Sequence, residues 1–203
     1  MFFSFDGLDG VGKTTQLERF CRWLGERGHD VVTCYDPGST PLGEDVRRIL
    51  LETTAPMAAT TEMLLFMAAR AQLVAELIQP ALAEGKVVVS DRFLLANVVY
   101  QGYGGGLDPE TLWEIGRVAT GGVEPDLTFV LDMPPETAAQ RLDRPLDRME
   151  SRGTEYKARL RQGFLSEAAK RKDRIALIDA SRDVDAVERD VRRLAEAMLK
   201  RAD

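Results

Sequence analysis

Residues 5–15 read FDGLDGVGKTT, and this stretch decides the fold. Gly7, Gly12, Lys13 and Thr14 stand at the spacing of a phosphate-binding loop, G-x-x-x-x-G-K-T. The loop follows a short apolar segment and precedes a run with helical periodicity, so it joins a strand to a helix N-terminus. Backbone N–H groups in such a turn surround phosphate oxygens at the positive end of the helix. The residues expected to bind the phosphates of ATP or GTP are Gly7, Leu8, Asp9, Gly10, Val11, Gly12, Lys13, Thr14 and Thr15.

Other apolar segments predict the rest of a parallel sheet. Short apolar runs bounded by polar or turn residues are typical of buried parallel strands, and they occur at residues 1–5, 31–35, 87–89, 127–131 and 175–178. Helical patterns lie between them: one ends before Gly28, one runs from about 61 to 83 with an interruption expected near Pro80, and one opens at Asp108. A last amphipathic helix contains residues 187–198. Alternating strands and helices predict an α/β fold.

Composition excludes several classes of protein. The chain has 203 residues, 44% hydrophobic and 30% charged, and no apolar run reaches the roughly 18 residues of a membrane span. We therefore expect one domain, residues 1–203, in the cytoplasm and without a membrane partner. A net charge of −6 argues against a nucleic-acid partner. Cys21 and Cys34 are expected to be buried thiols, and a single histidine, His29, argues against a zinc site or a Ser-His-Asp triad.

A second part of the site is predicted at residues 90–102, SDRFLLANVVYQG, directly after the strand at 87–89. Ligands of open α/β sheets gather at the carboxyl ends of the strands, so Asp91 and Arg92 should emerge beside the phosphate loop. Lys13 would neutralise the β- and γ-phosphates, while Thr14 and Asp91 would hold Mg²⁺ or its waters. Arg92 would bind a phosphate with its guanidinium fork. The alternative for Asp91 and Arg92 is a surface ion pair.

The loop alone leaves several functions open. A GTPase would normally carry an Asn-Lys-x-Asp segment after a strand, and the chain has none. A motor or regulatory ATPase, or a kinase that phosphorylates a nucleotide or nucleoside, remains compatible with the motifs described so far.

A family resemblance covers nearly the whole chain. The segments that carry it, in order, are FDGLDGVGKTT, DPGSTPLGEDVR, LLFMAARAQLVAELIQPAL, SDRF, VVYQG, PDLTFVLD and LDRMES. Their order and spacing resemble those of thymidylate kinases. The resemblance implies transfer of the γ-phosphoryl group of ATP to dTMP, with Mg²⁺, by a cytoplasmic homodimer. It also implies a three-layer fold of the P-loop NTP hydrolase type, a five-stranded parallel sheet flanked by helices, and a lid at about 141–152.

The resemblance assigns the nucleoside end of the acceptor site. Phe66 looks like the ring that stacks on thymine, and Arg70 looks like the donor to thymine O4. Asn97 resembles the amide that reads N3, and Tyr100 resembles the ring packed beneath the sugar. Asp9 is similar to the family carboxylate near the 3′-hydroxyl. The alternative for Phe66 and Arg70 is core packing, because their spacing of four puts both on one helix face.

The resemblance also assigns the phosphate contacts. Arg47 and Arg92 match the arginines that bind the acceptor phosphate, and Arg144 and Arg148 look like lid arginines that close over the transferring group. The segment 141–174 holds 11 basic and 6 acidic residues, which suits that role, although 157–174 is better interpreted as a solvated helix face. A phosphate monoester with a second pKa of about 6 needs no general base near pH 7. The catalytic residues expected are Lys13, Asp91, Arg92, Arg144 and Arg148.

This chain departs from the family pattern around the acceptor site. Tyr35-Asp36 stands where Arg-Glu is usual before Pro-Gly, which removes a positive charge there. Ala96 replaces a usual serine, Phe93 a tyrosine or histidine, and Asp6 a glutamate.

Overall fold

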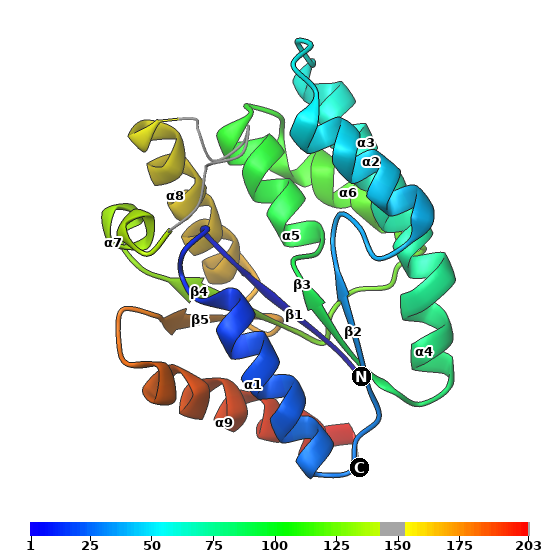
Figure 1. Cartoon of the computed structure of the whole chain (residues 1–203), viewed down its shortest axis with the longest axis vertical. Coiled ribbons are helices and arrows are strands. Elements are labelled where there is room, and N and C mark those ends of the chain that lie inside the picture. Colours follow the sequence, from blue (N-terminus) through cyan, green and yellow to red (C-terminus); the bar gives the residue numbers. More distant parts are fainter. Residues whose placement is uncertain (143–152, 203) are drawn as a thin grey trace.

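A five-stranded parallel sheet forms the centre of the computed structural model, which describes residues 1–142 and 153–202 (Figure 1). The strand order is β2-β3-β1-β4-β5, and every neighbouring pair is parallel. The strands are β1 (Phe2–Gly7), β2 (Val31–Tyr35), β3 (Val87–Asp91), β4 (Leu127–Asp132) and β5 (Ile175–Asp179). All five lie where the apolar runs predicted them. Four of them extend one or two residues further at the carboxyl end, where the polar side chains begin.

β1 lies in the middle of the sheet, between β3 and β4. All six of its residues are buried. Phe3 and Phe5 contact Phe129 of β4 and Phe20 of the first helix, with ring centroids 5.0 to 5.8 Å apart. Because β3 and β4 flank β1, the carboxyl end of β1 opens between two other strand ends, and the phosphate loop begins there.

Helices cover both faces of the sheet, which gives three layers (Figure 1). The helices α1 and α9 pack on one face, and α4, α5 and α8 pack on the other. Their bounds are α1 (Lys13–Glu26), α2 (Pro41–Glu52), α3 (Ala59–Leu73), α4 (Gln79–Ala83), α5 (Leu94–Asn97), α6 (Pro109–Ala119), α7 (Pro135–Gln140), α8 (Thr154–Lys170) and α9 (Val184–Ala202). Two π-helical segments, η1 (Val74–Ile78) and η2 (Val98–Gly104), continue α3 and α5.

The long helix expected at 61–83 is present but interrupted as predicted. It runs from Ala59 to Ala83 as α3, η1 and α4, and the π-helical turn η1 ends just before Pro80. A proline has no N–H to donate to the preceding turn, so the regular hydrogen-bond ladder breaks there.

Helix starts follow the expected capping chemistry. Asp108 accepts a hydrogen bond from the backbone N–H of Thr111 at 2.9 Å, and Pro109 occupies the first turn of α6. In the same way, Thr40 caps α2 by accepting from the N–H of Gly43 at 3.0 Å. The sequence patterns did not predict α2, η2 or the short helices α5 and α7.

The helix α8 corresponds to the segment interpreted as a solvated face. One side of it is buried, through Leu160, Phe164 and Glu167, while most of its basic residues face outward. Arg161 is an exception to the solvated interpretation, because it forms a bidentate ion pair with Asp132 at 2.8 Å. Cys21 and Cys34 are free thiols, and burial raises the pKa of Cys34 to about 12. No helix in residues 1–142 and 153–202 is both long and apolar enough to cross a membrane.

Candidate active site

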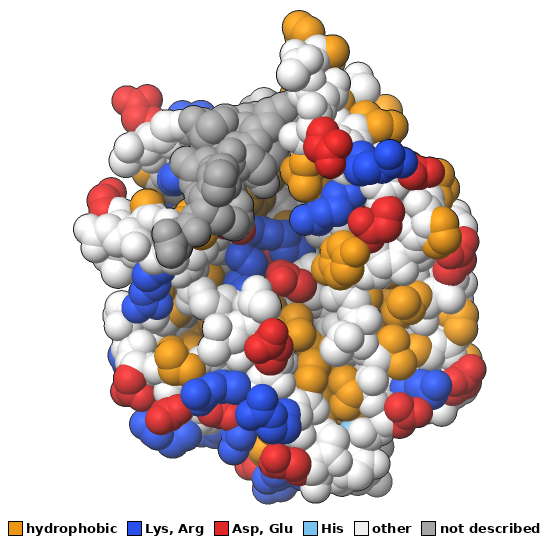
Figure 2. Space-filling view, in the orientation of Figure 1, with side chains coloured by type: hydrophobic (Ala, Val, Ile, Leu, Met, Phe, Trp, Pro, Cys, Tyr) orange, Lys and Arg blue, Asp and Glu red, His pale blue; other side chains and the backbone are white. Residues whose placement is uncertain are grey.

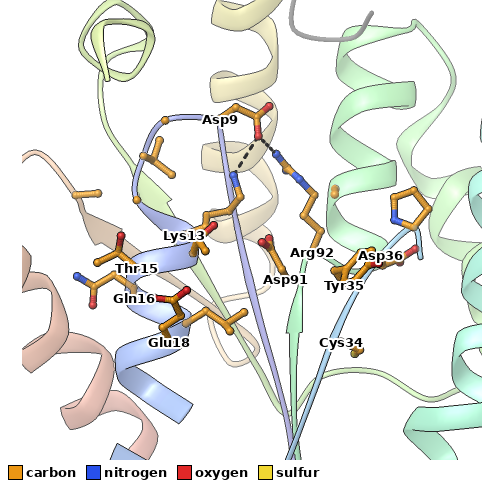
Figure 3. Close-up of a pocket in the computed structure, with 18 of the residues that line it drawn as sticks. Asp9, Lys13, Thr15, Gln16, Glu18, Cys34, Tyr35, Asp36, Asp91 and Arg92 are labelled. Atoms are coloured by element: carbon orange, nitrogen blue, oxygen red, sulfur yellow. Dashed lines mark hydrogen bonds and ion pairs between the residues drawn. The ribbon is translucent and has the colours of Figure 1, made fainter. Parts of the chain in front are cut away.

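A cavity of about 1050 Å³ lies at the carboxyl ends of β1, β2 and β3. Figure 2 shows the face on which it opens, with Lys and Arg side chains gathered at its centre. Residues from the phosphate loop, from β2 and β3 and from α3 and η2 line it, so segments far apart in the sequence meet there. Figure 3 shows the central side chains.

The phosphate loop owes its shape to glycines. Gly10 and Gly12 have φ angles of 86° and 95°, in the left-handed region that side chains disfavour. A Cβ on Gly10 would also lie 2.1 Å from the carbonyl oxygen of Ala138. Residues 9–15 line the cavity, whereas Gly7 and Leu8 do not and contribute backbone carbonyls beneath it. The first N–H groups of α1 have no intrahelical acceptor, so they are available to phosphate oxygens.

Lys13 lies in the loop and is almost fully buried. Its Nζ donates to the carbonyl oxygens of Leu8 at 2.9 Å and Gly7 at 3.3 Å, and to Asp9 Oδ1 at 3.3 Å. Burial and the nearby Arg92 cation lower the pKa of Lys13, and Asp9 opposes them. The ammonium group is therefore a buried cation at the mouth of the loop, where a phosphate can replace Asp9 as its partner.

Asp9 joins the loop to the second part of the site. Its carboxylate pairs with Arg92 Nη2 and accepts from the Tyr100 hydroxyl at 3.1 Å, and dashed lines in Figure 3 mark its bonds to Lys13 and Arg92. Burial alone would raise the pKa of Asp9, but Arg92 and Lys13 outweigh it and hold that pKa below its usual value. Asp9, Lys13, Arg92 and Tyr100 thus form one cluster.

Arg92 reaches this cluster from the end of β3. It has a positive φ of 65°, unusual for a residue other than glycine, and its backbone N–H donates to the carbonyl of Phe5 at 2.9 Å. Its guanidinium donates to the Gly7 carbonyl at 3.1 Å and lies 5.1 Å from the centroid of the Tyr100 ring. This arrangement contradicts the alternative of an exposed Asp-Arg pair, because Arg92 is paired with Asp9 inside the cavity rather than with Asp91 at the surface.

Asp6 carries a carboxyl group beneath the cluster, and it was not among the predicted site residues. It is fully buried, 3.6 Å from Arg92 Nη1, and neither of its oxygens has a hydrogen-bond partner among the described residues. Burial raises the pKa of Asp6 to about 7, and Arg92 and Lys13 limit the rise. Its position near the end of a buried strand, directly before the phosphate loop, is the sequence feature that could have assigned it to the site.

At one end of the cavity, Arg70 and Asn97 are in direct contact. Arg70 is 1% exposed, which excludes a surface role, and its Nη1 donates to Asn97 Oδ1 at 3.1 Å. Its Nε pairs with Asp36 Oδ2 at 2.5 Å. Asn97 in turn donates from Nδ2 to Gln101 Oε1 at 2.6 Å. Asp36 and Gln101 also line the cavity, and the sequence analysis had not included them.

Phe66 and Arg47 line the same end of the cavity. Arg47 Nη1 donates to the Pro37 carbonyl at 2.9 Å, and the guanidinium carbon lies 5.4 Å from the centroid of the Tyr35 ring. The Tyr35 hydroxyl donates to Glu44. The ring of Tyr35 therefore supports the guanidinium of Arg47.

The opposite end of the cavity lies beyond the loop. Its lining includes Arg141, Ala180, Arg182 and Val184, from the chain after α7 and from the β5–α9 connection. Gln16 of α1 donates to the Val184 carbonyl at 2.9 Å and so ties the loop helix to this end. The cavity therefore extends on both sides of the phosphate loop. Arg144 and Arg148, and most of the expected lid, lie outside the described residues.

Donor groups suited to ATP and Mg²⁺ are present. Thr14 is exposed at the start of α1 and Asp91 is half-buried, and both line the cavity. Among residues 1–142 and 153–202, no group of three or more His, Cys, Asp or Glu side chains could enclose a metal ion. Mg²⁺ usually takes one or two protein oxygens and completes its octahedron with phosphates and water, so the oxygens of Thr14 and Asp91 are of a suitable kind.

Comparisons with known proteins agree with this geometry. A family model described as thymidylate kinase matches residues 5–191. The thymidylate kinase of Rhodopirellula baltica is 48% identical over 184 residues, which cover 91% of this chain and 75% of the relative. That of Symbiobacterium thermophilum is 45% identical over 203 residues, covering 99% of this chain and 95% of the relative. A crystal structure of thymidylate kinase from Ehrlichia chaffeensis is similar with a TM-score of 0.79 and 31% identity, over 97% of this chain and 98% of that one.

Proposed function

The chain belongs to the thymidylate kinase family, and from this we propose that it transfers the γ-phosphoryl group of ATP to dTMP, giving dTDP and ADP. The observation that carries the proposal is the continuity of one cavity between the phosphate loop and the buried Arg70–Asn97 pair. A regulatory ATPase needs the loop but has no need of a polar pair that can read the edge of a base.

ATP would bind with its phosphates on residues 9–15 and its nucleoside toward Arg182 and Val184. Lys13 would leave Asp9 for the β- and γ-phosphates, as a buried cation that needs an anionic partner. Mg²⁺, held by Thr14 and through Asp91, would supply charge neutralisation between the β- and γ-phosphates.

The acceptor would bind at the other end of the cavity. Phe66 would stack on the thymine ring, Arg70 would donate to O4, and Asn97 would accept from N3–H; all three line the cavity. Tyr100 would pack against the sugar, with Asp9 near its 3′-hydroxyl. Arg47 and Arg92 would bind the acceptor phosphate, each within the cavity lining.

Chemistry would then consist of alignment and charge neutralisation. The phosphate group of dTMP is mostly dianionic above its second pKa of about 6. One of its oxygens would attack the γ-phosphorus while the bond from that phosphorus to the β–γ bridging oxygen breaks and ADP leaves. Lys13 and Arg92 would stabilise the charge on the equatorial oxygens. Arg144 and Arg148 would add to this from the lid at about 141–152, within a single kinase domain of residues 1–203.

A homodimer in the cytoplasm is part of the same proposal. The helix α3 is apolar around much of its circumference, and it packs between α2 and α6. Exposed apolar side chains on these three helices are Leu42, Ile49, Leu64 and Val118. A second copy would cover this surface. Free thiols at Cys21 and Cys34 are in keeping with a reducing compartment.

Direct identification of the product tests the proposed function. The protein is incubated with ATP, Mg²⁺ and dTMP, and the nucleotides are separated by anion exchange. We expect dTDP and ADP in equal amounts. ADP formed at the same rate with and without dTMP, and no dTDP, would contradict the proposal.

A further inference from the structure

Five buried polar side chains form one hydrogen-bonded row at the acceptor end of the cavity. In order they are Glu62, Gln101, Asn97, Arg70 and Asp36, each 4% exposed or less. Glu62 Oε1 accepts from Gln101 Nε2 at 3.0 Å, and the row continues through Asn97 and Arg70 to Asp36. Glu62 is the member that does not line the cavity, so it lies behind the others.

The chemistry of the two ends determines the direction of every bond in the row. A carboxylate only accepts, so Gln101 must turn its NH₂ group to Glu62 and its carbonyl to Asn97. Asn97 must then turn its NH₂ group to Gln101 and its carbonyl to Arg70. A guanidinium only donates, so the carbonyl of Asn97, and not its NH₂ group, must face Arg70.

The reverse orientation of the two amides is disfavoured at both ends. It would face the carbonyl of Gln101 toward the carboxylate of Glu62, and the NH₂ group of Asn97 toward the guanidinium of Arg70. Both contacts would place like groups opposite each other between buried side chains, which is costly. The row therefore holds the Asn97 carbonyl beside the Arg70 N–H groups.

We propose that Glu62 is a positioning residue that sets base specificity by fixing the amide orientation of Asn97 through Gln101. This inference rests on the proposed dTMP kinase function. A donor followed by an acceptor matches O4 and N3–H of thymine. Cytosine presents an amine and an unprotonated N3 at the same positions, so it meets a donor with a donor and an acceptor with an acceptor. If Asn97 could turn freely, one of these two mismatches would disappear.

Glu62→Gln tests the inference with the smallest change of shape. A carboxamide can donate as well as accept, so Gln101 could also turn its carbonyl toward position 62 and its NH₂ group toward Asn97. We expect the ratio of kcat/KM for dTMP over dCMP to fall by about 5-fold or more, within the range for a lost hydrogen-bond constraint, while the KM for ATP stays unchanged. The Kd values of dTMP and dCMP without ATP should change in the same ratio.

Glu167→Gln is the matched control. Glu167 is also a fully buried carboxylate. It accepts hydrogen bonds from the hydroxyl of Tyr103 in η2 at 2.8 Å and from the indole N–H of Trp113 at 2.9 Å. None of these three residues lines the cavity. This variant should lower the unfolding temperature and leave the dTMP to dCMP ratio as in the parent. An equal fall of the ratio in both variants would make Glu62 a structural residue only.

A double-mutant cycle tests the direction of the row without relying on activity. In Asn97→Asp the new carboxylate has no N–H for Gln101, and Glu62 prevents Gln101 from turning. We expect a lower unfolding temperature, and a partial recovery when Glu62→Gln is added, because Gln101 can then donate to the new carboxylate. Asp36→Asn in the same background controls for charge, since it also removes a negative charge but does not free Gln101.

The outcomes separate this inference from the proposed function. Recovery by Glu62→Gln but not by Asp36→Asn supports the fixed row. Additive losses, or equal recovery by both, contradict it. A parent protein that forms no dTDP would instead overturn the kinase function, while the unfolding cycle would still report on the row.

Discussion

Lys13 is the residue of the phosphate loop whose role a substitution tests most directly. It is held by two backbone carbonyls and Asp9, all of which it can exchange for phosphate oxygens. Lys13→Met keeps the apolar stem and removes the charge, so kcat should fall by about 10²-fold or more, equivalent to roughly 3 kcal/mol of transition-state stabilisation. Steady-state kinetics check this, with Lys86→Met at the surface as the control. A folded Lys13 variant that turns over at the parent rate would refute the role.

Asp6 predicts a pH dependence of stability. Its pKa in the folded protein is about 7, above the ordinary value, so the folded state binds this proton more tightly than the unfolded state. Stability from this group is therefore present below pH 4 and is lost as pH rises toward 7. Asp6→Asn stays neutral, so its free energy of unfolding relative to the parent should increase between pH 5 and pH 8, by on the order of 1 to 3 kcal/mol.

Urea unfolding of both proteins at several pH values measures this difference. The rise above pH 5 is the informative part, because a carboxylate kept ionised by Arg92 would change the stability only below about pH 4. A difference that does not change with pH would mean that Asp6 keeps its charge in the folded protein.

At the scale of elements, Tyr35 of β2 and Arg47 of α2 act together. The Tyr35 ring lies beneath the guanidinium, and Arg47 also bonds to the Pro37 carbonyl. Tyr35→Leu removes the cation–π contact, so the KM for dTMP should rise by about 2- to 5-fold at a nearly unchanged kcat. Tyr35→Phe keeps the ring and should behave as the parent. If both variants change KM equally, the hydroxyl bond to Glu44 is the important contact instead.

The elements that the sequence predicted are those with a strong local signal. All five strands, the loop and the Asp108 cap follow from apolar runs, glycines and side-chain caps. The helix α2 was missed although Thr40 and Pro41 stand at its start as Asp108 and Pro109 do at the start of α6. The segment η2 was missed because a π-helical turn depends on the packing of α6 and α8 around it. In the site, the resemblance assigned Arg70 and Asn97 to the same base, and the two side chains are hydrogen-bonded to each other.

The buried partners of these residues depend on long-range contacts. Asp36 lies 34 residues from Arg70 in the sequence, and Gln101 lies 39 residues from Glu62. No local pattern indicates such pairs. The spacing of four between Glu62, Phe66 and Arg70, and between Asn97 and Gln101, was nevertheless a signal that these side chains share helix faces.

At the scale of the whole molecule, the apolar surface over α2, α3 and α6 predicts a dimer. Leu64 is 52% exposed on α3, the helix that contacts both α2 and α6. Leu64→Glu would bury a charge in the proposed interface, so this variant should be monomeric by light scattering at concentrations where the parent is dimeric. Leu177→Glu, at a comparable exposure on β5, should leave the mass unchanged. A parent that is itself monomeric would contradict the homodimer.

The central claim is that one cavity joins ATP binding to the reading of a thymine base, and a panel of acceptors tests it most directly. ADP release is measured with dTMP, dUMP, UMP, dCMP, AMP, GMP and thymidine. Because Arg70 can only donate, a cytosine amine opposite it leaves buried donors unpaired. We predict that dTMP is the best substrate and exceeds dCMP by at least about 10³-fold in kcat/KM. ADP release that is the same with every acceptor, or with none, would contradict the account.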